Sequence, residues 1–245
     1  MSSAPVVDSG EPAGPLLQAS NLFCERDDRI LFADLNFSVA AGDLLQVKGS
    51  NGSGKTTLLR IICGLNDGYE GDIYWQGQPV HLNREQFLAS LLYIGHRNAV
   101  NKILSPRENL RWRCALHTRV EDAAIEQALA QVSLSGYEDV PCRNLSAGQQ
   151  QRVSLASLQI SPARLWILDE PFTTLDVKGV KVLESLLAKH VNAGGAVLVT
   201  THHRLDVPCE LRTLDLDHSC TLDPKCILDP NRILDPKQIE SRGRE

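Results

Sequence analysis

The 245-residue sequence predicts an α/β fold, and three observations carry this prediction. A buried-strand pattern at 44–48 is joined by a glycine-rich loop to a helical pattern, in which apolar residues recur from 58 to 65. Two later apolar runs, 165–168 and 196–200, each end at polar residues. Residues with a helical period also lie before the run at 165–168, so an α/β core with attached subdomains is expected.

The glycine-rich loop fits the pattern G-x-x-x-x-G-K-[ST] of phosphate-binding P-loops. Its glycines let backbone N–H groups curve around phosphate oxygens, and the start of the next helix adds positive potential. We expect Lys55 to reach the β- and γ-phosphates of a nucleoside triphosphate and Thr56 to coordinate Mg²⁺. A flexible loop without a ligand is the alternative, but chance gives the pattern in only about one random chain per hundred. The predicted ATP-binding residues are Gly49, Ser50, Asn51, Gly52, Ser53, Gly54, Lys55, Thr56 and Thr57.

The segments on either side of the loop predict a small antiparallel sheet. Residues 1–15 are rich in Ser, Pro, Gly and Ala and are predicted to form a disordered lead. Strand-like patterns follow at 16–19, 30–32 and 35–39, and residues 71–80 have the pattern of a hairpin. We expect these strands to lie beside the nucleotide.

Residues from about 97 to 160 predict a helical subdomain. Thr118 and Glu121 fit a helix capping box. One apolar stripe behind them predicts a helix that packs into a core: Ala124, Ile125, Ala128, Leu129 and Val132.

Polar residues end the two later strands. Asp169 and Glu170 follow the first run, and His202 follows the second. Ligands of open α/β sheets bind at the carboxyl ends of strands, so we expect these side chains and the glycine loop to converge on one phosphate. The alternative for the two carboxylates is a solvated turn after a strand.

The composition argues against several classes of protein. A formal net charge of −5 gives no general attraction to nucleic acid. The longest apolar runs are too short to cross a bilayer, and the N-terminus lacks the pattern of a signal peptide. The seven cysteines form no C-x-x-C pair, so we expect small buried residues in a reducing compartment, not metal ligands. The prediction is a soluble, cytoplasmic protein that binds no nucleic acid.

The C-terminal segment, 216–245, repeats Leu-Asp-Pro every six residues from Leu222. A solenoid needs several stacked turns to bury a face, and three proline-containing units are too few. We predict a disordered extension.

The motifs in their order resemble those of ABC-type ATPases. The resemblance covers about residues 16–205 and implies an ATPase domain, which we place at 16–215, with a P-loop NTPase core, an antiparallel β subdomain and a helical subdomain. It implies ATP and Mg²⁺ as cofactors. It also implies that a second copy of the chain pairs head to tail, so that each ATP contacts the signature motif of the partner. The residues that resemble this signature are Leu145, Ser146, Ala147, Gly148 and Gln149.

The resemblance also assigns roles within the site. Asp169 would hold Mg²⁺ opposite Thr56, and Glu170 would be the general base that polarises the attacking water. His202 would sense or stabilise the γ-phosphate, and with Glu170 and Lys55 it completes the predicted catalytic set. Leu175 and Asp176 would lie across the dimer seam, near the opposite P-loop.

Three positions depart from the common family pattern. Ala147 stands where the signature usually has its first glycine. His96 stands where a glutamine usually links Mg²⁺ to the membrane subunit, and its imidazole can accept from water or coordinate the metal. The aromatic residue that usually stacks on adenine is missing, and Arg26 or Phe23 would replace it.

Four segments resemble more closely the ATPases of bacterial cytochrome c maturation, a family of haem exporter ATP-binding subunits. This resemblance implies a peripheral subunit on the cytoplasmic face of the bacterial inner membrane. Its partners would be integral membrane subunits that release a haem-loaded chaperone, so that haem is involved only indirectly, and residues 97–110 would form the coupling surface. The alternatives are the motor of another small ABC exporter and a soluble ABC protein acting on nucleic acid or ribosomes. The four segments are 24–29, 93–96, 145–150 and 165–173.

Overall fold

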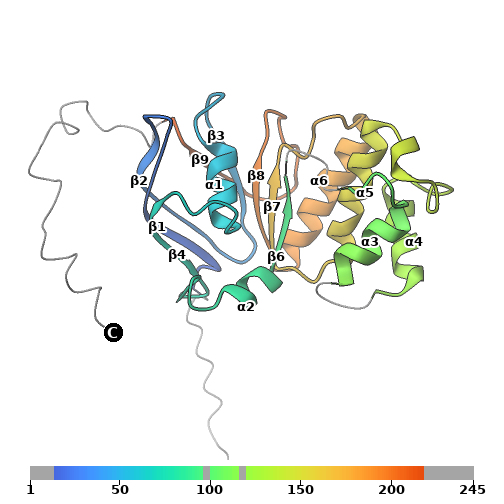
Figure 1. Cartoon of the computed structure of the whole chain (residues 1–245), viewed down its shortest axis with the longest axis horizontal. Coiled ribbons are helices and arrows are strands. Elements are labelled where there is room, and N and C mark those ends of the chain that lie inside the picture. Colours follow the sequence, from blue (N-terminus) through green and yellow to red (C-terminus); the bar gives the residue numbers. More distant parts are fainter. Residues whose placement is uncertain (1–13, 96–99, 116–119, 218–245) are drawn as a thin grey trace, which may run out of the picture.

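The structure, a computed structural model, describes residues 14–95, 100–115 and 120–217. Almost all of the predicted lead and tail, and also His96, lie outside these residues. The described chain forms two sheets with helices between and beside them (Figure 1). The predicted α/β class, with an antiparallel sheet and helices, is confirmed.

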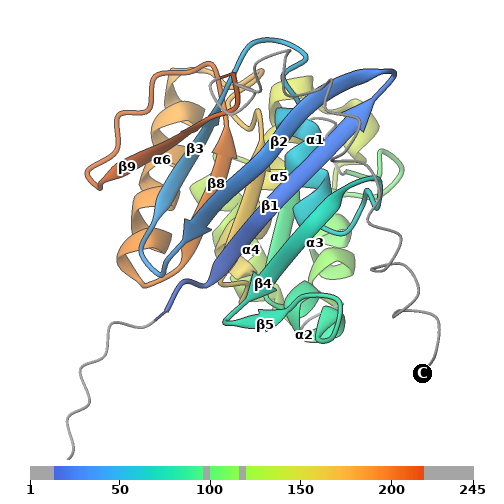
Figure 2. The same cartoon turned by 90° about the vertical axis from the view of Figure 1, so that its left-hand side faces the viewer.

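The antiparallel sheet is built around one long hairpin, and the predicted short strand segments are parts of it (Figure 2). Asp27 and Asp28 form the hairpin turn with positive φ angles of 53° and 59°, the conformation that tight two-residue hairpin loops require. The sheet order is β2 (Arg29–Val39), β1 (Leu17–Arg26), β4 (Glu70–Trp75) and β5 (Gln78–Pro79).

The second sheet contains the strand before the glycine loop, and all its neighbouring strands pair in parallel. Two of its strands are buried at every residue, as expected when helices cover both faces of a parallel sheet. The order is β6 (Leu91–Ile94), β7 (Leu165–Asp169), β8 (Ala196–Thr200), β3 (Leu44–Lys48) and β9 (Leu211–Asp215). The carboxyl ends of β7, β8 and β3 are therefore adjacent, and this adjacency positions the site.

Helices cover the two faces of the parallel sheet in different ways. The helix after the glycine loop, α1 (Lys55–Ile62), lies between the two sheets (Figure 1). Its apolar residues join one core cluster with β1 and the parallel strands. The opposite face is covered by α5 (Ala147–Ile160) and α6 (Val177–Asn192), which share a second cluster with the helical subdomain.

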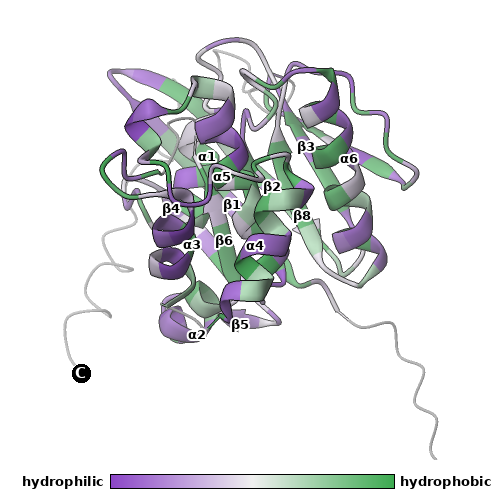
Figure 3. Cartoon of the chain, turned by 90° about the vertical axis from the view of Figure 1, so that its right-hand side faces the viewer, coloured by the Kyte–Doolittle hydropathy of each residue, from purple (hydrophilic) through white to green (hydrophobic). Residues whose placement is uncertain are grey.

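The helical subdomain packs against α5. It contains α3 (Pro106–Ala115), α4 (Asp122–Gln131) and the short 3₁₀ turn η1 (Cys142–Asn144). The predicted apolar stripe is confirmed, because Ile125, Ala128, Leu129 and Val132 are buried. Hydrophilic residues predominate on α3, while the strands inside are hydrophobic (Figure 3).

The predicted capping box at Thr118 and Glu121 is wrong. Helix α4 begins at Asp122, and Glu121 is its N-cap with extended φ and ψ of −71° and 146°. The Glu121 carbonyl accepts the N–H groups of Ala124 and Ile125, so Glu121 cannot be the third helical residue. Thr118 lies outside the described residues.

The sequence patterns did not predict α6 or the short α2 (Arg84–Ala89). Helix α2 connects the antiparallel sheet to β6, and it buries Phe87 against Trp75 with ring centroids 5.5 Å apart. None of the helices in the described part of the chain is both long and apolar enough to cross a membrane.

The expectation of buried cysteines is confirmed at four positions. Burial raises the pKa of each of these thiols, and for Cys63 burial and then the nearby Asp169 charge raise it to about 12. Cys209 is half-buried, and Cys220 and Cys226 lie outside the described residues. The four buried cysteines are Cys24, Cys63, Cys114 and Cys142.

Candidate active site

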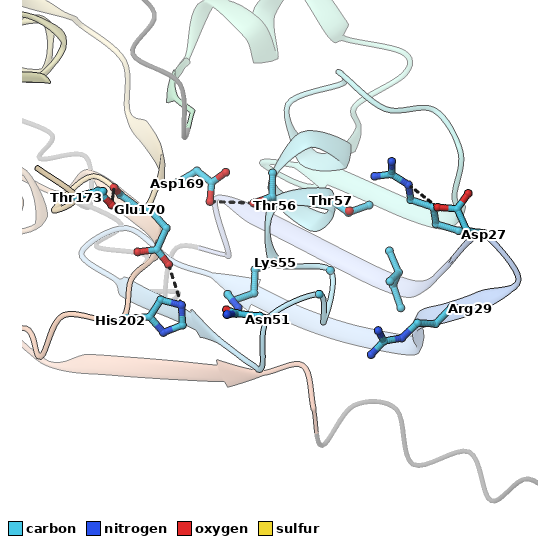
Figure 4. Close-up of a pocket in the computed structure, with 14 residues that line it drawn as sticks. Asp27, Arg29, Asn51, Lys55, Thr56, Thr57, Asp169, Glu170, Thr173 and His202 are labelled. Carbon is cyan, nitrogen blue, oxygen red and sulfur yellow. Dashed lines mark hydrogen bonds and ion pairs between the residues drawn. The ribbon is translucent and has the colours of Figure 1, made fainter. Parts of the chain in front are cut away.

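A cleft of about 730 Å³ lies where the glycine loop meets the carboxyl ends of β7 and β8. Six of the nine predicted loop residues, the two strand-end carboxylates and His202 line it, as the sequence predicted, whereas Gly49, Ser50 and Ser53 of the predicted ATP-binding set do not (Figure 4). Its lining residues are Arg26, Asp27, Arg29, Leu31, Asn51, Gly52, Gly54, Lys55, Thr56, Thr57, Asp169, Glu170, Thr173 and His202.

The glycine loop needs its glycines for two different reasons. Gly49 has a φ of 148°, which residues with a side chain rarely adopt, and a Cβ there would lie 2.4 Å from the Ser53 Oγ and 3.0 Å from the Ser53 Cβ. Gly54 is the N-cap of α1 with a left-handed φ of 96°, and it supplies no capping side chain. The first N–H groups of α1 therefore face the cleft without a side-chain cap, as in helix N-termini that bind phosphate.

Lys55 is the basic residue at the centre of the cleft. Its Nζ donates to the carbonyls of Gly49 and Ser50, at 2.8 and 2.9 Å. These bonds fold the side chain back over its own loop, and this places the ammonium group among the lining residues.

Asp169 and Thr56 form an oxygen-rich corner of the cleft. The Thr56 Oγ1 donates to the Asp169 Oδ1 at 3.2 Å, and Asp169 is only 2% exposed. The Asp169 Oδ2 is buried and has no hydrogen-bond partner in the described part of the chain. An unpaired buried carboxylate oxygen beside a hydroxyl suits a hard divalent cation, so these residues fit Mg²⁺.

The protein alone does not enclose a metal there. Within the described ranges, no group of three or more His, Cys, Asp and Glu side chains could hold an ion. A cation at Thr56 and Asp169 would therefore take most of its oxygen ligands from phosphate and water. His96, the third predicted metal residue, lies outside the described residues.

Glu170 is held in an unusual backbone conformation that directs it into the cleft. Its φ is 51°, and its N–H donates to both the carbonyl and the hydroxyl oxygen of Thr200, at 3.1 and 3.0 Å. The Glu170 Oε1 is buried, and the His202 Nε2 lies 3.6 Å away from it (Figure 4). A left-handed non-glycine residue at a functional position indicates strain that the surrounding structure maintains.

Thr200 is a site residue that the sequence reasoning missed. It is the last residue of β8 and is completely buried, and its hydroxyl donates to the Asp169 Oδ1 at 2.7 Å. It therefore joins Asp169 and Glu170. A threonine at the end of an apolar strand, two residues before His202, was the available signal.

The far end of the cleft is lined by the β1–β2 hairpin. Arg26 and Arg29 line it, whereas Phe23 is half-buried elsewhere and does not. Arg26 pairs with Asp27 at 3.4 Å and remains largely exposed. Of the two candidates for stacking on adenine, Arg26 is the one that lines the cleft.

The signature residues lie at the start of α5 and are not among the lining residues of the cleft. Ser146 is the N-cap: its Oγ accepts the Gln149 N–H, and the Gln149 Oε1 accepts the Ser146 N–H. Ala147 begins the helix, where alanine is favourable. A Cβ on Gly148 would lie 2.9 Å from the Thr174 carbonyl oxygen, so this position needs glycine.

Two contacts link α5 to the segment that follows Glu170. The buried Gln151 Nε2 donates to the Pro171 carbonyl at 3.0 Å. Arg152 pairs with Asp176 at 2.9 Å, and the hydrogen bond from the Gly179 N–H, followed by the Arg152 charge, lowers the Asp176 pKa. The sequence reasoning missed both contacts, because they join residues far apart in the chain.

Comparison with known proteins agrees with this geometry. The family model described as ABC transporter matches residues 32–173. A cytochrome c biogenesis ATP-binding export protein from Hahella chejuensis is 52% identical over 82% of this chain and 96% of its own length. The corresponding protein from Pseudomonas fluorescens is 51% identical over the same shares.

Solved structures give the same fold. A candidate ABC transporter ATP-binding protein from Pyrococcus furiosus has a TM-score of 0.72 and 25% identity, covering 82% of this chain and 98% of its own. A dimeric ATP-binding cassette bound to ADP and Pi has a TM-score of 0.69 and 22% identity, over 76% of this chain and 88% of its own. On its motifs, its fold and these relatives, the chain belongs to the ABC transporter ATPase family and, within it, to the cytochrome c biogenesis ATP-binding export proteins.

Proposed function

We propose that this chain is the ATP-hydrolysing subunit of a bacterial inner-membrane ABC complex that serves cytochrome c biogenesis. The observation that supports ATP hydrolysis is the composition of the cleft. Its lining includes Lys55, Thr56, Asp169, Glu170 and His202. The pathway is supported by the relatives, cytochrome c biogenesis ATP-binding export proteins that are about 50% identical to this chain over nearly their whole length. In this role, hydrolysis would drive the release of a haem-loaded chaperone by separate membrane subunits.

The chain's own groups would hold the triphosphate. The N–H groups of the loop and of the start of α1 would bind phosphate oxygens, and the Lys55 ammonium would exchange its carbonyl partners for the β- and γ-phosphates. Mg²⁺, for which Thr56 and Asp169 are the fitting protein groups, would neutralise charge on those phosphates. Arg26 would stack on the adenine.

Glu170 would be the general base. Its Oε1 would accept a proton from the water whose oxygen attacks the γ-phosphorus, while the bond to ADP breaks and phosphate is released. Thr200 would keep the carboxylate in place through the Glu170 N–H. His202, whose Nε2 lies 3.6 Å from the same oxygen, would donate to the γ-phosphate.

A second copy of the chain would complete each site. The signature residues Ser146, Ala147, Gly148 and Gln149 are not among the lining residues of the cleft of their own chain, which supports a role on the partner's ATP. The start of α5 would favour the γ-phosphate there through its dipole. One neighbour in fold was solved as a dimer in a post-hydrolysis state.

The membrane subunits would dock on the helical subdomain. Ile103 is 76% exposed and Trp112 on α3 is 65% exposed, so two large apolar side chains are available for contact on this subdomain. Aromatic residues of this kind often dominate the energy of an interface. Docking here, beside the predicted coupling surface of 97–110, would hold the chain at the cytoplasmic face of the inner membrane.

The proposal is tested in a bacterium that lacks its own member of this family. The wild-type chain should restore c-type cytochromes and co-purify in mild detergent with the membrane subunits of cytochrome c maturation. Lys55→Ala should co-purify equally but restore no cytochromes, and Glu210→Ala, an exposed carboxylate removed outside the cleft, should behave as wild type. Co-purification with an unrelated permease, or full restoration by Lys55→Ala, would contradict the proposal.

A further inference from the structure

The last strand of the parallel sheet is followed by Asp217, whose carboxylate contacts the glycine loop. Strand β9 pairs with β3 up to Asp215, opposite Lys48. The next residue, Leu216, is completely buried, and its N–H donates to the Lys48 carbonyl at 3.0 Å. Burial and this bond fix the chain at the point where β3 enters the loop, and they place Asp217 beside Ser50.

The Asp217 carboxylate binds Ser50 through both oxygens. The Ser50 N–H donates to Oδ2 at 2.7 Å, and the Ser50 Oγ donates to Oδ1 at 2.9 Å. The Asp217 N–H itself donates to the Asp215 Oδ1 at 3.0 Å, which limits the movement of the residue. Hydrogen bonds to an ionised carboxylate are shorter and stronger than those between neutral groups.

This contact lies outside the phosphate cleft. Asp217 is not among the lining residues, whereas the later loop residues Asn51, Gly52 and Gly54 are. The Ser50 N–H is therefore occupied by protein and is not one of the loop donors that face a phosphate. Asp217 can orient the loop without touching the nucleotide.

The opposite side of the same corner is held by Lys55, whose Nζ binds the carbonyls of Gly49 and Ser50. The rest of the loop contains Gly52 and Gly54, which have positive φ angles and broad conformational freedom. When phosphates attract the ammonium group, the carbonyl contacts weaken. The Asp217 contact is then the one that still fixes the first corner of the loop.

We propose that Asp217 is a positioning residue for the phosphate-binding loop, and that it increases nucleotide affinity by holding Ser50 in the binding conformation. The inference rests on the proposed ATP site. If the loop is already ordered before ATP binds, less conformational entropy is lost on binding. We therefore expect Asp217 to lower the dissociation constant for ATP. Once ATP is bound, its phosphates order the loop, and turnover at saturation should change little.

The test measures dissociation constants and steady-state kinetics on the full-length chain, with ATP as the probe. Asp217→Ala should raise the Kd and the KM for ATP at least fivefold, with kcat within twofold of wild type. Asp217→Asn keeps an acceptor for the Ser50 N–H and should stay within twofold. Ser50→Ala removes one of the two bonds and should raise Kd about two- to threefold. Glu210→Ala, an exposed carboxylate next to the start of β9, is the matched control and should not alter Kd.

Three results would overturn the inference. One is an unchanged Kd in Asp217→Ala, whatever happens to its melting temperature, because the role would then be purely structural. Another is tighter binding in both Asp217→Ala and Asp217→Asn, which would mean that the charge acts by repulsion. If Asp217→Ala does not fold, an unchanged Kd in Ser50→Ala decides against the inference. Absence of ATP binding by the wild-type chain would instead contradict the proposed function.

Discussion

Thr200 shows how one buried hydroxyl can set the geometry of two carboxylates. Its Oγ1 donates to the Asp169 Oδ1 and accepts the Glu170 N–H, so it joins the fitting cation ligand to the proposed base. The N–H of Glu170 also donates to the Thr200 carbonyl, which maintains the left-handed backbone of Glu170. The chemistry of the cleft thus depends on a residue with no direct part in it.

Glu170→Gln should retain ATP binding and lose hydrolysis. The amide cannot accept the proton of the attacking water, while the loop and Lys55 are unaffected, so we expect turnover to fall by at least about 10²-fold. Phosphate release and ATP binding, measured on the same preparation, check this. Turnover near that of wild type would remove Glu170 from the role of base, and Glu210→Gln is the control for loss of a carboxylate.

Thr200→Val keeps the shape of the side chain and deletes both hydroxyl contacts. Losing a buried hydrogen bond to a charged group should reduce the free energy of unfolding by about 1–3 kcal/mol. Turnover should fall as well, by about tenfold, because Asp169 and Glu170 lose their common support. Urea unfolding and phosphate release measure the two effects, and Thr200→Ser should restore both. A valine variant as stable and active as wild type would show that the hydroxyl is dispensable.

The helix α5 links the signature to the segment after Glu170 in the same chain. Gln151 reaches Pro171, Arg152 reaches Asp176, and Gly148 packs closely against the carbonyl of Thr174. A movement of either segment must therefore disturb the other. This arrangement would let a signature bound to the partner's ATP influence the base of its own site.

The close approach at Gly148 gives a stability prediction with an internal control. Gly148→Ala places a Cβ 2.9 Å from a backbone oxygen, and overpacking of this kind costs about 1–3 kcal/mol. Ala147→Gly, one residue earlier, only adds backbone freedom at the start of the helix and should cost up to about 1 kcal/mol. Urea unfolding of the two variants should rank Gly148→Ala as the less stable, and the reverse order would contradict the packing argument.

A contact between the helix α6 and the strand β7 should make the free energy of unfolding depend on pH. The His190 ring stacks on Trp166 with centroids 3.7 Å apart, and its Nε2 donates to the Arg164 carbonyl at 3.2 Å. Burial lowers the pKa of His190 below its ordinary 6.5, and this effect exceeds the opposing effect of the hydrogen bonds with the backbone of Arg164 and Ala196. Below pH 6.5 the unfolded chain therefore binds a proton that the folded chain does not bind.

Stability should accordingly fall as the pH decreases from about 6.5 towards the lowered pKa of His190. His190→Gln keeps an N–H donor for the Arg164 carbonyl but does not titrate, so its loss of stability between pH 7.5 and 5.5 should be smaller. Urea unfolding at several pH values measures the two slopes. Equal slopes would show that other groups cause the acid sensitivity.

Across the whole molecule, the sequence could predict the features that depend on residues close together in the chain. The glycine loop, the strand that precedes it and the carboxylates at the end of β7 each have a short pattern with a direct physical meaning. The contacts Thr200–Asp169 and Ser50–Asp217 join residues 31 and 167 positions apart, so they exist only because of the strand order of the sheet. The predicted capping box at Glu121 was wrong for a different reason. The local sequence pattern placed the start of the helix at Thr118, whereas α4 begins at Asp122 and Glu121 is its N-cap.

In the proposed function, two copies of the chain share their ATP sites through the signature motif. In Glu170→Gln, ATP should convert the monomer into a dimer, because bound ATP is not hydrolysed. Adding Ser146→Arg places a large side chain at the exposed start of α5, at a residue that does not line the cleft of its own chain.

Light scattering with and without ATP, together with ATP binding by the monomer, is the most direct measurement. We predict that the double variant binds ATP within twofold of Glu170→Gln but remains a monomer, whereas Glu170→Gln with Glu210→Arg dimerises normally. Loss of ATP binding by the monomer of the double variant would place the signature in its own site. Dimerisation despite Ser146→Arg would likewise contradict the shared site.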